Sequence, residues 1–110
     1  MGCIVENLRQ FKRVKIDLGA ELMLNHRAFQ ITVKDISLGG AYIETSMNLK
    51  MNEEVELRIF LNAVEHVVEV SGRVAWLKGQ DGFGIAFQEL KPIDVWALMK
   101  QTESEPKEAF

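Results

Sequence analysis

Two short groups of polar residues in this chain of 110 residues have the types and spacing to hold a phosphate-bearing or planar ligand. The first is a basic segment in which Arg9 and Arg13 lie four residues apart, with Lys12 between them. A guanidinium group suits bidentate pairing with phosphate or with the O6/N7 edge of guanine, and it can stack on a base. Taken by itself, the segment is more simply a solvated basic arm.

The second group is the run Asp35-Ile36-Ser37-Leu38-Gly39-Gly40. An ionised Asp35 only accepts hydrogen bonds, so it can take the N1–H and N2–H donors of a guanine, which an arginine cannot. Ser37 can bind a phosphate or a base heteroatom, and Gly39 and Gly40 leave the backbone accessible and permit positive φ. The same residues also suit a turn between two strands, so the run by itself leaves a turn and a site as alternatives.

The elements that must position these residues are strands. Apolar residues alternate with polar ones in six segments, which is typical of half-buried antiparallel strands. The sequence predicts a bulge at Gly19, a hairpin turn at Asn25–Arg27, and an interruption of the second strand at Asp35. The six segments cover residues 14–24, 29–34, 41–45, 55–61, 66–77 and 83–88.

The spacing changes to that of a helix after Leu90. Ile93, Trp96, Ala97 and Met99 recur at helical intervals, which predicts a short amphipathic helix over residues 92–102 with a frayed continuation from Gln101. Six short strands with hairpin links must close into a small barrel or pack as a sandwich, since an apolar sheet face cannot remain in water. We therefore expect an all-β domain at 14–102, a flexible N-terminal arm at 1–13 and a flexible tail at 103–110.

Several classes of protein fit the composition poorly. A net charge of -3 argues against a broad nucleic-acid surface, and Cys3, the one cysteine, excludes an internal disulfide framework. No apolar run approaches the roughly 18 residues of a membrane helix, so we expect a cytoplasmic protein without membrane insertion. His26 and His66 show no partner spacing for catalysis or metal binding, and we expect both to be exposed. Because no catalytic constellation is visible, no enzyme is predicted. We expect Trp76 and Trp96 to be core or rim packing residues.

The two polar groups in this order resemble the motifs of the PilZ family, the bacterial receptors for cyclic di-GMP. Arg9-Gln10-Phe11-Lys12-Arg13 matches an Arg-x-x-x-Arg motif, and Asp35-Ile36-Ser37-Leu38-Gly39-Gly40 matches Asp-x-Ser-x-x-Gly. The later segments Gly72–Trp76 and Gly84–Phe87 extend the resemblance to roughly residues 8–100. It implies a small six-stranded antiparallel β-barrel with a short C-terminal helix. The N-terminal arm would fold across the outer surface of the barrel.

The resemblance also implies a function and a set of site residues. Arg9 and Arg13 would clamp cyclic di-GMP, Asp35 and Ser37 would supply contacts from the barrel, and Gly40 would allow close approach. Lys12 and Gly39 are supplementary candidates. Leu8 stands where some family members have a further arginine and bind a stacked, paired ligand, so one ligand per site is favoured.

The expected role is a non-catalytic receptor, with no cofactor and no metal, that switches a partner protein not identified by the sequence. Family roles in motility and biofilm formation make those the expected outputs. We expect a monomer or a weak homo-oligomer. The alternative is an adaptor of the same fold that acts through protein–protein contacts without the nucleotide. An enzyme on a small barrel, such as a flavin reductase, is a third class and would need a cofactor.

Overall fold

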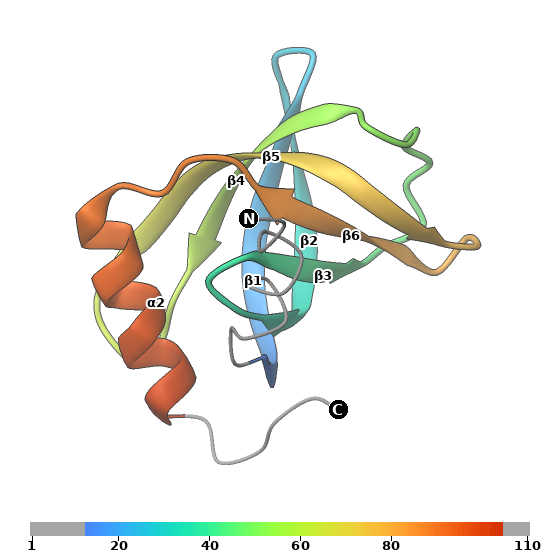
Figure 1. Ribbon diagram of the computed structural model, residues 1–110. Helices are drawn as coiled ribbons and strands as arrows, with labels where there is room; N and C mark the ends of the chain where they lie inside the picture. Colours follow the sequence, from blue (N-terminus) through green and yellow to red (C-terminus); the bar gives the residue numbers. More distant parts are fainter. Residues whose placement is uncertain (1–12, 105–110) are drawn as a thin grey trace, which may run out of the picture.

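A computed structural model of the protein describes residues 13–104, and Arg9, Lys12 and Cys3 lie outside this range. The predicted arm and tail are represented only by Arg13, Glu103 and Ser104. Figure 1 shows six strands that curl into a barrel, with a single described helix beside it. The strands are β1 (Val14–Leu24), β2 (Arg27–Ile36), β3 (Gly40–Glu44), β4 (Glu54–Phe60), β5 (Val67–Lys78) and β6 (Gly82–Phe87), and the helix is α2 (Pro92–Ser104).

The barrel is closed in the order β1-β2-β3-β6-β5-β4, and every neighbouring pair is antiparallel. This confirms the predicted six-stranded barrel over the sandwich. The hairpin between β1 and β2 turns at Asn25 and His26, whose φ angles are 53° and 65°. Two successive positive φ angles are the signature of the tight turn that matches the twist of paired strands, and the predicted turn is therefore confirmed.

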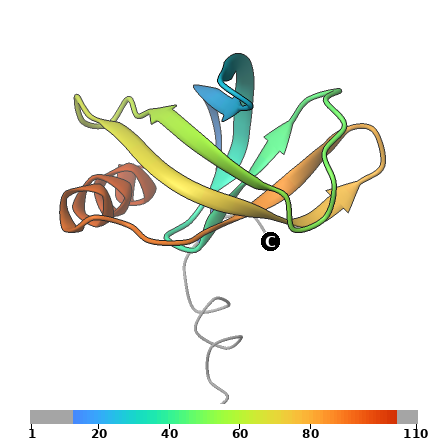
Figure 2. The ribbon, with the colours of Figure 1, turned by 90° about the horizontal axis from the view of Figure 1, so that it is seen from above.

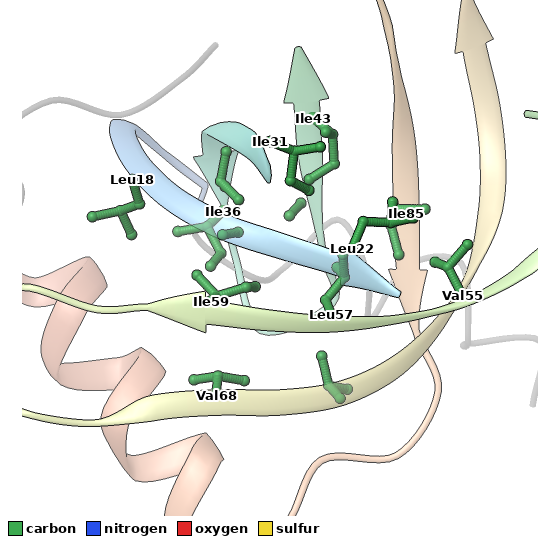
Figure 3. Packing of buried hydrophobic residues seen from close by; sticks show 14 of the residues in the cluster. Leu18, Leu22, Ile31, Ile36, Ile43, Val55, Leu57, Ile59, Val68 and Ile85 are labelled. Atoms are coloured by element: carbon green, nitrogen blue, oxygen red, sulfur yellow. The ribbon is translucent and has the colours of Figure 1, made fainter. Parts of the chain in front are cut away.

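The core lies inside the barrel and is lined by alternate residues of every strand. Figure 3 shows these aliphatic side chains pointing toward one another from opposite strands. Closure is favourable because it removes the apolar face of the sheet from water, and each Å² of apolar surface buried contributes about 25 cal/mol of stabilisation. The largest fully buried side chains of the strands are Val14, Leu22, Val33, Ile36, Ile43, Leu57, Ile59, Val68, Val74 and Phe83.

Three β-bulges interrupt the ladders, and none is at the predicted position, Gly19; the one on β2 lies between Val33 and Asp35. On β1 the register shifts between Lys15 and Leu18, whereas Gly19 pairs regularly with Thr32. On β5 it shifts between Val74 and Trp76, so Ala75 is the extra residue. Because side chains alternate with a period of two, the extra residue on β5 places Trp76 on the face opposite to that of Val74. The bulge on β5 therefore determines where Trp76 points.

The helix α2 packs beside the barrel near the β4–β5 connection and extends two residues beyond the predicted end (Figure 2). Within residues 13–104 no helix is long and apolar enough to span a membrane. The predicted apolar face is wrong for three of its four residues, since Ile93, Trp96 and Met99 are 52%, 48% and 44% exposed and Ala97 alone is buried. The side that is buried carries Asp94, Ala97, Leu98, Gln101 and Thr102.

Hydrogen bonds explain why the polar Asp94 and Gln101 lie on the buried side of α2 together with Ala97 and Leu98. Gln101 accepts the backbone N–H groups of Asn62 and Ala63 at 3.0 and 2.9 Å, and its amide nitrogen donates to Asn62 Oδ1 at 2.9 Å. Asp94 Oδ1 lies 2.7 Å from His66 Nε2. Gln101 is therefore an anchor rather than the start of a frayed end. His66 is partly buried, and its predicted exposure is wrong because it holds the helix.

Candidate functional site

Asp35 is held within β2, because this strand continues to Ile36 rather than stopping before the polar run. Asp35 pairs with Lys15 of β1 and with Tyr42 of β3. Its Oδ1 accepts a hydrogen bond of 2.6 Å from Nη2 of Arg13, the residue that precedes β1. The two predicted groups of site residues therefore meet through this ion pair, and Asp35 orients the guanidinium group. Arg9 and Lys12, the remaining members of the basic group, lie outside the described residues.

The turn after β2 is fixed by bonds of its own. The Ser37 N–H donates to the Gly40 carbonyl at 2.9 Å, and Ser37 Oγ accepts the Gly39 N–H at 3.1 Å. The Gly39 carbonyl in turn accepts the Phe87 N–H at 2.9 Å, which ties the turn to β6. Ser37 therefore has a structural role. Its hydroxyl can still donate a hydrogen bond to a ligand, because in the Gly39 contact it acts as the acceptor.

Gly40 begins β3 where the backbone of β6 comes very close. A Cβ atom at this position would lie 2.2 Å from the Ile85 carbonyl oxygen, a distance that real side chains do not adopt. The absence of a side chain is therefore required for β3 to pair with β6. The prediction that Gly40 also permits a ligand to approach stays a prediction.

A cavity of about 230 Å³ opens on the outer face of β3, β6 and β5. Arg13 and Ser37 stand beside it, and Trp76 of β5 forms another part of the wall. Apart from Ile85, the other lining residues are small, which is why the surface is hollowed here. These small residues are Gly39, Gly40, Ala41, Ala75 and Ala86.

Trp76 is the site residue that sequence reasoning missed. Strict alternation places it with the inward-facing Val70 and Val74, but the bulge at Ala75 turns it outward, and it is 41% exposed. Its ring stacks on Tyr42 of β3, with the centroids 5.2 Å apart and the planes 2° from parallel. A usable signal was present in β6, where the outward positions Gly84 and Ala86 leave room for a large neighbour.

The arrangement can bind a ligand that combines negative charge with a planar apolar group. Arg13, with its side chain 47% exposed, offers guanidinium donors, Ser37 offers a hydroxyl and Trp76 offers an aromatic face. Among residues 13–104 no group of three or more His, Cys, Asp or Glu side chains is placed to hold a metal ion.

Comparison with solved structures gives close matches to this barrel. The inhibitor of motility MotI/DgrA from Bacillus subtilis superposes with a TM-score of 0.76 at 19% identity, over 86% of this chain and 49% of that one. The PilZ domain of YcgR from Escherichia coli, solved with c-di-GMP, gives 0.69 at 14% identity, over 88% and 90%. PlzA from Borreliella burgdorferi, also with c-di-GMP, gives 0.64 at 20% identity, over 90% and 43%.

These identities establish a shared fold. The chain spans about half the length of MotI/DgrA and less than half that of PlzA. A sequence comparison with curated proteins found no match. The model of the PilZ domain family, however, matches residues 7–101, a range that includes both polar motifs and all six strands. The chain therefore belongs to the PilZ domain family.

Proposed function

We propose that this domain binds cyclic di-GMP on the outer face of β3, β6 and β5 and passes the signal to a partner protein. The observation that carries the proposal is the convergence of Arg13, Ser37 and Trp76 around one cavity of a PilZ domain. YcgR and PlzA, which share the fold, were solved with this nucleotide. In this proposal the domain is a cytoplasmic receptor without catalytic activity of its own.

Each wall of the cavity matches one part of the ligand. Arg13 would pair with a phosphate or with the O6/N7 edge of a guanine, and Asp35 would hold it in that orientation. The Ser37 hydroxyl would donate to a phosphate oxygen or a base heteroatom, with Gly39 and Gly40 leaving the adjacent backbone open. A guanine would stack on Trp76, an interaction that is open to any base because every base has a π-face, so selection of guanine would rest on Arg13 and Ser37.

The size of the cavity favours a role for the arm. Its volume of about 230 Å³ is below the roughly 300–1,000 Å³ of pockets that enclose drug-sized ligands. The described surface would therefore receive one part of cyclic di-GMP and leave the rest open. We infer that residues 1–12, with Arg9 and Lys12, close over the remainder, so that ligand binding changes the surface offered to a partner.

The alternative is an adaptor that binds a protein without the nucleotide. The observation in its favour is the outward side of α2, where Ile93, Trp96 and Met99 are each about half exposed.

Titration of the full chain with cyclic di-GMP, followed by tryptophan fluorescence, separates the two proposals. Saturable quenching is expected for a receptor because Trp76 lines the cavity, and it should disappear in Trp76→Phe. Absence of any cyclic di-GMP binding would contradict the receptor proposal and favour the adaptor. Motility is the first output to examine, given the function named for MotI/DgrA.

A further inference from the structure

The outward side of β6 is a row of small residues, Gly82, Gly84 and Ala86, that alternates with the inward Phe83 and Ile85. A Cβ atom on Gly82 would lie 2.1 Å from the Ile43 carbonyl oxygen and 2.8 Å from the Tyr42 hydroxyl oxygen. A Cβ atom on Gly84 would lie 2.2 Å from the Trp76 indole. Gly82 therefore makes room for the β3 backbone and the Tyr42 hydroxyl, Gly84 makes room for the Trp76 ring, and the third small residue, Ala86, lines the cavity.

The two rings are held differently. Tyr42 and Trp76 both pair with Gly84, from β3 on one side and β5 on the other, so they meet above it. Tyr42 is 9% exposed, whereas Trp76 is 41% exposed. Lys78 Nζ also lies 5.6 Å from the centre of the Tyr42 ring, within the range of a cation–π contact. Tyr42 is thus the fixed ring, and Trp76 is the ring between it and open space.

We propose that Tyr42 is a positioning residue that holds Trp76 as a preformed stacking platform, and that Ala86 sets the room for a planar base beside it. This rests on the proposed function. An exposed tryptophan would otherwise lose side-chain freedom when a base stacks on it, and this loss weakens binding. The stack on Tyr42 and the slot above Gly84 restrict the indole before the ligand arrives. The base then continues the series of planar groups over Ala86.

A double-mutant cycle tests the role of Tyr42. Stacking of a base on an aromatic side chain accounts for about a 5- to 150-fold difference in affinity, which is the loss expected for Trp76→Ala. Tyr42→Leu should weaken cyclic di-GMP binding several-fold, Tyr42→Phe should restore it, and Tyr42→Leu should have no further effect in Trp76→Ala. Equal losses with and without Trp76, or unchanged affinity in a folded Tyr42→Leu, would overturn the role of Tyr42.

Ala86→Val tests the second half of the proposal with little demand on folding, because valine is favoured in strands. The added methyl groups should fill the place of the base and weaken cyclic di-GMP binding at least about tenfold, comparable with loss of the stack. Ala28→Val is the matched control, since Ala28 is an exposed strand residue of β2 outside this cavity. Equal affinities of Ala86→Val and Ala28→Val would refute the assignment of Ala86.

A ligand-free measurement separates failure of this inference from failure of the proposed function. In a Trp96→Phe background, Trp76 is the single tryptophan, and its fluorescence anisotropy reports how firmly it is held. Tyr42→Leu should lower the anisotropy and increase quenching by acrylamide, whereas Tyr42→Phe should change neither. If cyclic di-GMP fails to bind the unmodified protein, the proposed function falls and this result still decides the role of Tyr42. Unchanged anisotropy in Tyr42→Leu contradicts that role.

Discussion

Arg13 Nη2 donates to Asp35 Oδ1 at 2.6 Å, and this contact joins the residue before β1 to the end of β2. The Arg13 side chain is 47% exposed and that of Asp35 is 17% exposed. An ion pair with that much solvent contact contributes only about 0–1 kcal/mol to stability. Its significance is geometric, because it fixes a guanidinium group at the rim of the cavity.

Arg13→Ala should therefore separate binding from folding. We expect cyclic di-GMP affinity to fall about 10- to 150-fold, the effect of losing one or more charge-assisted hydrogen bonds, while the free energy of unfolding changes by less than about 1 kcal/mol. Calorimetry and urea denaturation measure the two quantities. Arg58→Ala is the matched control, since Arg58 is 45% exposed and pairs with Glu21 and Glu69 on other strands. Equal affinities of the two variants would remove Arg13 from the site.

Gly40→Ala should destabilise the barrel, because the new Cβ atom would overlap the Ile85 carbonyl oxygen that it meets at 2.2 Å. We expect a loss of at least about 2 kcal/mol in the free energy of unfolding, as for other strained substitutions. Gly19→Ala is the control, since a Cβ at Gly19 meets nothing within 4 Å. Urea denaturation of both variants is the measurement, and similar midpoints would contradict the close approach of β3 to β6.

Gln101→Ala should loosen α2 from the barrel. The substitution removes the fully buried Gln101 amide and the acceptor that the backbone N–H groups of Asn62 and Ala63 share, so we expect the free energy of unfolding to fall by about 1–3 kcal/mol. Met99→Ala, on the exposed side of the same helix, should change stability by under about 0.5 kcal/mol. Thermal unfolding followed by circular dichroism compares them. Coincident melting curves would show that Gln101 does not anchor the helix.

Local patterns predicted the barrel well. The alternation in Val14–Leu24 and in the segment around Leu57 is regular because each strand has one face in the core and one in solvent. The turn at Asn25 and His26 follows from residues that tolerate positive φ. The link between the two motifs came from family resemblance, and the geometry at Arg13 and Asp35 brings them together.

Features that depend on contacts distant in sequence were not predictable. The outward position of Trp76 depends on a bulge at Ala75, and nothing in the β5 alternation indicates that bulge. The direction of α2 depends on Gln101 and Asp94. Their partners, Asn62 and His66, lie in the connection between β4 and β5. A hydrophobic pattern gives the spacing of a helix, but buried hydrogen bonds decided which side faces the barrel.

The most direct test of the central claim is a calorimetric titration of the full chain with cyclic di-GMP, with cyclic di-AMP and GTP as controls. We predict saturable binding of cyclic di-GMP with one ligand per domain, as Leu8 favours, and much weaker or no binding of the two controls. A folded protein that shows no heat of binding with cyclic di-GMP, or that binds all three nucleotides equally, would contradict the proposed receptor function.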